Sequence, residues 1–278
     1  MEPELLVTSD LHYGASPEGD RAVEALAEHV RGDGAAALVL AGDLAMSASR
    51  LETCLSLFDG FRGFKAAVPG NHDIWRSMGS TDSWDLHERV LPATFERHGF
   101  HPLHVGLAVL DGVAIVGSMG WYDYSFRDDI GIDIAAYRSK VYPGEDGPLW
   151  NDAICVRLPM SDEELTALLA RRLSEQLANV PPELSVLAVV HHLVTRQLLI
   201  HPRAAVPRRW RFANAFLGSD AFGRVLAGRV AQVFCGHAHY VRVVMVNGAR
   251  CVVVGSDYTK KQLLRATPTR LLESRMFE

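Results

Sequence analysis

The stretch Val68–Asp73 reads VPGNHD and ends an apolar run in residues that neither a helix nor a strand favours. Taken alone, it is a glycine and asparagine turn that closes a strand. The same arrangement recurs along the chain, where further short apolar runs end in aspartate or histidine. These strand ends are the main evidence for both the fold and the function that the sequence predicts.

Apolar runs rich in valine, leucine and alanine alternate with segments of helical periodicity in the first quarter of the chain. The pattern predicts strands over Leu5–Ser9, Ala36–Leu40 and Phe64–Val68, and helices over Arg21–Arg31 and Ser49–Phe58. Connections this short imply helices that pack on a central sheet. The alternation therefore predicts an α/β fold.

Two β-hairpins are predicted further along the chain. Ala108–Ser118 reads AVLDGVAIVGS, in which an Asp-Gly pair is a strong turn signal between two apolar runs, and Arg242–Val254 turns in the same way at an Asn-Gly pair. Leu187–Val190 and Val230–Phe234 read as two further buried strands. Antiparallel strands are therefore expected in a chain with two β-rich halves.

The segment at about residues 121–160 interrupts this rhythm because it is long, aromatic, charged and broken by Pro-Gly and Gly-Pro pairs. A loop of this length is usually functional or disordered, and its tryptophans and tyrosines argue against disorder. A helix then begins at Ser161 with N-cap and acidic first-turn signals and ends near Leu177. We therefore expect a single domain over residues 1–278 with a cap-like insertion at about 121–160.

The composition is that of an ordinary globular protein, with 278 residues, 48% hydrophobic and 22% charged residues and a net charge of −5. No basic track of the kind found in nucleic-acid-binding proteins is present, which disfavours a nucleic acid partner. The four cysteines lie far apart and are expected to be buried reduced thiols. Because no signal peptide or membrane span is recognisable, we expect a cytoplasmic protein without a membrane partner.

Five predicted strand ends carry residue types that bind metal ions. They are Asp10 with His12, Asp43, Asn71 with His72 and Asp73, His191 with His192, and His237 with His239. Ligands of open α/β sheets bind beyond the carboxyl ends of the strands, so distant strand ends can converge on one site. Aspartate, histidine and asparagine suit Mn, Fe or Zn, and the absence of cysteine from these positions disfavours a structural thiolate zinc site.

Each of these strand ends also has a simpler interpretation. The pair Asp10 and His12 fits a turn with a surface histidine, Asp43 fits a turn or helix cap, and the His237 motif fits a solvated turn. The adjacent residues His191 and His192 fit a hydrogen-bonded core histidine beside an exposed one. Separate turns do not account for five such matches in order, each at the end of an apolar run.

Together, the motifs resemble the five-block signature of the calcineurin-like metallophosphoesterases. The blocks are Asp10-x-His12, Gly42-Asp43, Gly70-Asn71-His72-Asp73, His191 and Gly236-His237-x-His239, and they extend from residue 10 to residue 239. The resemblance implies a four-layer α/β/β/α sandwich of two mixed β-sheets flanked by helices. In many relatives an acidic residue lies three positions after the metal-bridging aspartate, where this chain has Met46.

The resemblance also implies a role for each block. Asp10, His12 and His239 are expected to hold one metal ion, Asn71, His191 and His237 the other, and Asp43 to bridge the two. His191 is preferred over His192 because the family motif usually places the ligand directly after the strand. The cofactors implied are two divalent or mixed-valence metal ions, with Mn, Fe or Zn preferred.

A binuclear metal-dependent hydrolase of phosphoric esters is therefore expected, in which a metal-activated hydroxide attacks phosphorus in a small phosphodiester or phosphomonoester. His72 is the expected proton donor to the leaving group, and Asp73 is expected to orient its imidazole. Two alternatives remain: a catalytically silent binding or scaffold protein that retains the fold, and a structural site for one metal ion.

Two groups of side chains are candidates for substrate binding. If the insertion covers the metals, its aromatic rings and cations can stack on a planar group and contact phosphate; otherwise it is a packed surface excursion. A basic cluster after residue 200 is either a phosphate-attracting patch or a solvated loop. The side chains concerned are Trp121, Tyr122, Tyr124, Arg127, Tyr137, Arg138 and Lys140 in the insertion, and Arg203, Arg208, Arg209 and Arg211 in the basic cluster.

Overall fold

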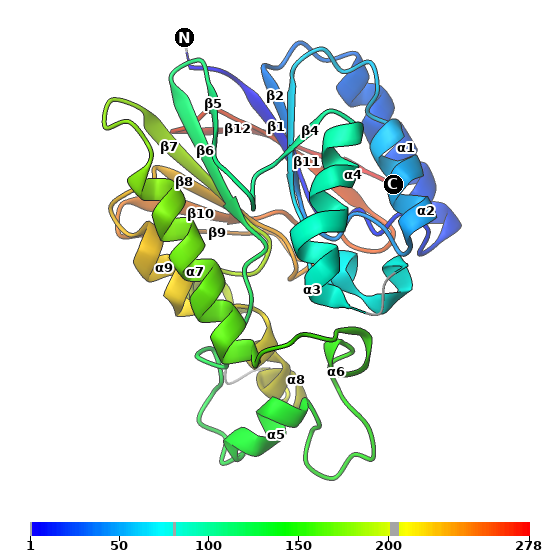
Figure 1. Ribbon diagram of the computed structural model, residues 1–278, viewed down its shortest axis with the longest axis vertical. Helices are drawn as coiled ribbons and strands as arrows, with labels where there is room; N and C mark the ends of the chain where they lie inside the picture. Colours follow the sequence, from blue (N-terminus) through cyan, green and yellow to red (C-terminus); the bar gives the residue numbers. More distant parts are fainter. Residues whose placement is uncertain (1, 80–81, 201–205) are drawn as a thin grey trace.

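Two mixed β-sheets of six strands each form the centre of the computed structural model, which describes residues 2–79, 82–200 and 206–278 (Figure 1). The first sheet has the strand order β12 (Leu271–Phe277), β11 (Lys261–Ala266), β1 (Leu5–Thr8), β2 (Ala37–Ala41), β3 (Phe64–Val68) and β4 (Phe100–Pro102). The second has the order β5 (Ala108–Leu110), β6 (Val113–Ser118), β7 (Ser185–Val190), β8 (Gln232–Cys235), β10 (Ala249–Val253) and β9 (Arg242–Val246). Strands β1 to β4 are parallel, as are β6, β7, β8 and β10.

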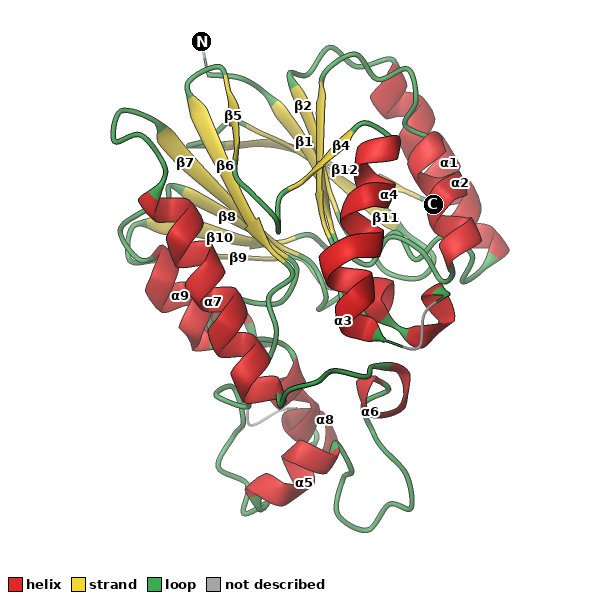
Figure 2. Ribbon diagram, viewed as in Figure 1, coloured by secondary structure: helices red, strands yellow, loops and turns green. Residues whose placement is uncertain are grey.

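Helices cover the outer face of each sheet, which gives the molecule four layers (Figure 2). On the first sheet lie α1 (Pro17–Arg31), α2 (Ala48–Ser56), α3 (Ser83–Asp85) and α4 (Leu91–Arg97), and on the second lie α7 (Asp162–Ala178) and α9 (Asp220–Leu226). Three short helices, α5 (Ile134–Ser139), α6 (Asp152–Cys155) and α8 (Arg208–Ala213), lie together below both sheets in the view of Figure 1. The expected α/β/β/α sandwich is confirmed.

The two-residue alternation of strand side chains explains the layers. In β1, Leu5 and Val7 point into the core between the two sheets, whereas Leu6 belongs to the core beneath the helices. The core between the sheets also contains Val39 of β2 and Val189 of β7. Because both faces of these strands are buried, the strands read as continuous apolar runs and their register is fixed.

Most of the predicted elements are present. Strand β3 has the predicted bounds, both predicted hairpins form, and α7 begins with a capping box between Ser161 and Glu164. The sequence reading missed β4, β11 and β12. In β11, the polar residues Lys261 and Gln262 are buried because they bond to other parts of the chain, including the Asp10 carbonyl 3.1 Å from Lys261 Nζ.

The insertion packs its aromatic side chains inward. Its aromatic rings (Trp121, Tyr122, Tyr124 and Tyr137) are at most 1% exposed, and Tyr122, Tyr124 and Tyr137 pack against Phe216. These rings therefore belong to the hydrophobic core beneath the helices, and the structure supports the packed segment rather than a stacking surface for substrate. The cations Arg138 and Lys140 are likewise paired, with Glu163 and Asp162.

The basic cluster fastens the insertion to α8. Arg209 pairs with Glu145, Arg211 pairs with Asp128, and Arg208 donates to the carbonyl of Ile130. Neither a phosphate-attracting patch nor a solvated loop describes these three arginines, and Arg203 lies outside the described residues. The four cysteines are free. Within the described part of the chain, no helix is long and apolar enough to cross a membrane.

Candidate metal centre

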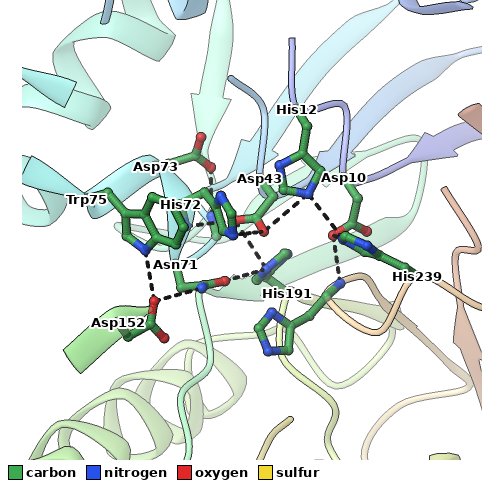
Figure 3. Close-up of polar contacts among 12 residues, drawn as sticks. Asp10, His12, Asp43, Asn71, His72, Asp73, Trp75, Asp152, His191 and His239 are labelled. Atoms are coloured by element: carbon green, nitrogen blue, oxygen red, sulfur yellow. Dashed lines mark hydrogen bonds and ion pairs between the residues drawn. The ribbon is translucent and has the colours of Figure 1, made fainter. Parts of the chain in front are cut away.

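The carboxyl ends of β1, β2, β3, β7 and β8 meet at one edge of the sandwich. The predicted ligands lie together there, and Figure 3 labels all of them except His237. Potential ligand atoms form three sets, and within each set the atoms lie no more than 4.8 Å apart. The sets are Asp10, His12 and His239; His12, Asp43 and His72; and Asp43, His191 and His237. The first and third sets match the two ligand groups that the sequence predicts, and Asn71 adjoins the third. Both sheets contribute, so the centre lies between the two halves of the fold.

Asp43 lies between the two predicted ligand groups. Its Oδ2 is 3.7 Å from Nε2 of His12, and its Oδ1 is 3.4 Å from Nε2 of His191. One carboxylate oxygen therefore faces each group, so the side chain is placed where two cations could share it. The Asp43 side chain is almost completely buried, so its charge needs compensation from its neighbours.

The first group brings two imidazoles and a carboxylate to one point. The Nε2 atoms of His12 and His239 are 3.1 Å apart, and Nε2 of His239 is 3.4 Å from Oδ1 of Asp10. Asp10 is held in place by the backbone N–H of His237 and by the hydroxyl of Ser9, which both donate to its carboxylate. Two imidazoles facing a buried carboxylate fit a transition-metal cation.

The second group is fixed by the orientation of the His191 ring. Its Nδ1 donates to the carbonyl of Ala41, 2.8 Å away, so Nε2 is the ring nitrogen that faces Asp43 and Oδ1 of Asn71, which lies 3.3 Å away. His192 points elsewhere, because its Nδ1 lies 3.1 Å from the carbonyl of Met119. The geometry therefore favours His191 over His192 as the ligand.

Five of the predicted ligands have left-handed backbone conformations, which are costly for residues other than glycine. Their φ angles are 53° for Asp10, 43° for His12, 56° for Asp43, 69° for His237 and 54° for His239. Strain of this kind persists only where the surrounding structure enforces it, and it concentrates at functional sites. The donor set and the strained backbone thus both fit a pair of bound metal ions.

The electrostatics of the centre keep Asp43 ionised. Burial alone would raise the pKa of Asp43, but His191, His72 and His12 hold it well below its usual range. Burial acts in the opposite direction on the imidazoles and lowers the pKa of His12 to about 3. For His191 the carboxylate of Asp43 outweighs burial and raises the pKa to about 9.

Residues 4–241 match the family model described as calcineurin-like phosphoesterase. The chain belongs to this family. Calcineurin-like phosphoesterases are metal-dependent hydrolases of phosphoric esters, and the two ligand groups give this chain the donors for a dimetal centre. A comparison with curated proteins gave no match.

Several solved structures share the fold of this calcineurin-like phosphoesterase. They include phosphopantetheinyl hydrolase (PptH) from Mycobacterium tuberculosis, with a TM-score of 0.69 and 21% identity over 92% of this chain and 90% of that chain. Two others cover 99% of both chains: TT1561 of Thermus thermophilus, with a TM-score of 0.60 and 14% identity, and a dimetal phosphatase from Danio rerio, with a TM-score of 0.55 and 12% identity. At these identities the likeness concerns the fold.

His72 lies beside the predicted metal ligands of this phosphoesterase and faces a cavity. Its Nε2 is 3.9 Å from Oδ2 of Asp43, its side chain is 13% exposed, and its ring stacks on Trp75 with the ring centres 3.7 Å apart. The imidazole thus has contact both with the ligand cluster and with the space that a substrate can enter.

Asp73 does not orient the His72 ring, and this expectation is corrected. The two carboxylate oxygens of Asp73 accept hydrogen bonds from the backbone N–H groups of Leu44 and Gly70, at 2.9 and 2.8 Å. No hydrogen bond joins its side chain to the His72 ring within the described residues. Asp73 instead ties the loop after β2 to the loop after β3, and so fixes the loops that carry Asp43 and Asn71.

The cavity beside His72 has a volume of about 690 Å³ and opens next to the predicted metal ligands. Its wall away from the ligands is largely apolar and comes from the insertion, the segment before α8, and α8 itself. The apolar lining residues include Leu149, Trp150, Ile200, Val206, Pro207 and Trp210. Among the described residues, neither lysine nor arginine lines it. The insertion therefore reaches the cavity through residues 149–152 rather than through the buried aromatic rings.

Sequence reasoning missed Asp152, Trp75 and Trp150, which all border this cavity. Asp152 is buried and bonds to Asn71, one of the predicted ligands. It follows no apolar strand and belongs to no motif, so no local pattern marks it. Only its position in the folded chain indicates its importance.

Proposed function

We propose that this chain hydrolyses phosphoric esters at a two-metal centre. The ligands proposed are Asp10, His12, Asp43 and His239 for one ion, and Asp43, Asn71, His191 and His237 for the other. The observation that carries the proposal is the position of Asp43, whose two oxygens face His12 and His191 from opposite ends of one carboxylate. The imidazole, carboxylate and amide donors suit Mn, Fe or Zn. The free thiols suit a reducing, cytoplasmic compartment.

Each protein group has a defined task in this reaction. Bound metal ions supply an activated water and neutralise charge on the phosphoryl oxygens. Asp43 keeps the two ligand groups at a fixed distance from each other, because its side chain contacts both. His72 donates a proton to the leaving oxygen from the cavity side, and the ring of Trp75 keeps the imidazole in place.

The cavity favours an ester whose organic part is apolar or aromatic. A phosphate bound at the metals would extend its alcohol group along Trp150 and Trp210, two aromatic side chains that line the cavity. Without cationic lining among the described residues, a polyanionic substrate such as a nucleic acid would have no partners for its further charges. A small phosphomonoester or phosphodiester of an uncharged alcohol fits best.

The activity is tested with metal-free protein that is reconstituted with Mn, Fe or Zn and given aryl phosphate monoesters and diesters. We expect hydrolysis to return with metal in the wild type and to be lost in Asp43→Asn and His72→Ala. Two bound ions without hydrolysis of any ester would instead support the scaffold alternative, and a single ion per chain would support a structural metal site.

The substrate class is tested by pairing naphthyl phosphate with methyl phosphate. We expect Trp210→Ala to raise KM for the naphthyl ester by about fivefold, because a stacking contact of about 1 kcal/mol is lost, and to leave the methyl ester unchanged. Met245→Ala is the control, since Met245 is equally exposed but lies outside the cavity lining. Equal effects of Trp210→Ala on both esters would contradict the assignment.

A further inference from the structure

The carboxylate of Asp152 collects four hydrogen bonds at the border of the metal centre. Oδ1 accepts from Nδ2 of Asn71 at 3.0 Å and from Nε1 of Trp75 at 2.8 Å, and Oδ2 accepts from the hydroxyl of Tyr122 at 3.1 Å and from Nε1 of Trp150 at 2.9 Å. The side chain is buried. Its charge is therefore compensated by directed donors rather than by water.

The bond to Asn71 determines which end of the amide faces the metal ligands. An amide has one oxygen with free lone pairs and one NH₂ group that can only donate. Because Asp152 accepts from Nδ2, Oδ1 of Asn71 is turned toward His191, 3.3 Å away (Figure 3). The reversed amide would direct its NH₂ group at the ligand cluster, where it cannot bind a cation.

The bond to Trp75 extends the same control to the proposed proton donor. Trp75 stacks on His72 with the ring planes 23° apart, and the indole N–H fixes the rotation of Trp75 through Asp152. One carboxylate thus holds both a predicted ligand and the ring that supports His72. It comes from α6 in the insertion, a segment that contributes none of the predicted ligands.

We propose that Asp152 is a positioning residue of the metal centre, which presents the oxygen of Asn71 to the second metal ion and holds Trp75 against His72. The insertion accordingly completes the centre from outside the ligand set. This proposal rests on the two-metal centre proposed above. It predicts that metal affinity, and not activity alone, depends on Asp152, as is general for groups that orient a metal ligand.

The test compares Asp152→Asn with Asp162→Asn by calorimetric titration of metal-free protein with Mn²⁺ and Zn²⁺. Asp162 is the matched control because its carboxylate also accepts from the insertion, from Trp121, Tyr124 and Lys140, but contacts no predicted ligand. We expect Asp152→Asn to weaken one of the two metal sites by about 10- to 100-fold and to leave the other within threefold. Asp162→Asn should leave both sites within threefold.

Exchanging the two side chains, Asn71 and Asp152, distinguishes a lost interaction from a variant that has simply unfolded. Asn71→Asp places two carboxylates side by side and should weaken the same site, whereas Asn71→Asp combined with Asp152→Asn restores a carboxylate that accepts from an amide. We expect the double variant to bind the second ion at least tenfold more tightly than Asn71→Asp alone. Circular dichroism verifies that each variant is folded.

Two results would overturn the proposal: wild-type affinity at both sites in Asp152→Asn, or equal losses in Asp152→Asn and Asp162→Asn. Failure of the double variant to recover affinity would also contradict the role of the amide. The titrations do not depend on turnover. If the wild type binds two ions but hydrolyses no ester, the proposed function fails while the role of Asp152 is still decided.

Discussion

An alanine in place of Gly70 tests the close packing around the proposed bridging carboxylate. A Cβ atom at this position would lie 2.1 Å from Oδ1 of Asp43, 2.5 Å from its backbone nitrogen and 2.7 Å from Nε2 of His191. Ordinary contacts begin near 3.4 Å, so Asp43 or the strand end would have to move by about 1 Å. Gly70 does not have a left-handed φ, so the effect is steric and not conformational.

The expected losses follow from this displacement. Overpacking of a buried site costs about 1–3 kcal/mol of unfolding free energy, and a shift of about 1 Å in a catalytic group costs about 100-fold in rate. We therefore expect Gly70→Ala to lose about 100-fold in kcat/KM and to bind fewer than two metal ions per chain.

The assay combines ester hydrolysis, elemental analysis of bound metal and urea denaturation. Gly34→Ala is the control, because Gly34 is exposed and a Cβ atom there meets nothing within 4 Å. A Gly70→Ala variant with two bound ions and activity within threefold of the wild type would refute the packing that we describe.

Three further predictions concern stability and metal removal. Asp73→Asn leaves one acceptor oxygen for two backbone donors and should lower the unfolding free energy by about 1–3 kcal/mol but kcat by less than tenfold. A loss of activity as large as that of His72→Ala would instead indicate a direct role for Asp73. Burial alone would raise the pKa of Glu88, but His87 and Arg172 lower it from 4.5 to about 2. The stabilisation that ionised Glu88 gains from these two neighbours is therefore present above pH 4.5 and is lost as the pH falls toward 2. Urea denaturation of wild type and Glu88→Gln should therefore differ by about 1 kcal/mol at pH 7 and should converge on acidification, whereas a constant difference would contradict this linkage. Metal removal by a chelator should lower the melting temperature and abolish activity, and saturating metal should restore about 3 kcal/mol per site; an unchanged melting temperature would argue against bound metal as part of the native fold.

The features that the sequence predicted well are those with local signals. Strand β3 was predicted from its apolar run and the turn after it, and α7 from the N-cap and acidic first-turn signals at Ser161. The grouping of the strand ends followed from the rule that ligands lie beyond the carboxyl ends of strands, and the seven ligand candidates do lie close together. Hydrophobic periodicity and turn-forming residues are properties of neighbouring positions, so they can be recognised in a single sequence.

The features that were missed depend on distant parts of the chain. Strand β11 pairs with β1 across nearly the whole sequence, and its first residue, Lys261, is polar yet completely buried. The aromatic content of the insertion gave no indication of which face Trp121 and Tyr124 would take. Asp152 has no local signal because three of its four donors, Asn71, Trp75 and Tyr122, lie between 30 and 81 residues away in the sequence.

The placement of ligands on both sheets has a consequence for how the protein matures. Asp10 and His239 are separated by most of the chain, and β1 also needs its partner β11 near the carboxyl end. A nascent polypeptide therefore cannot assemble the proposed ligand set until the chain through β11 has left the ribosome and both sheets have docked. We therefore expect the proposed metal ions to be acquired late in folding, so the ion bound depends on which metals the chain then meets.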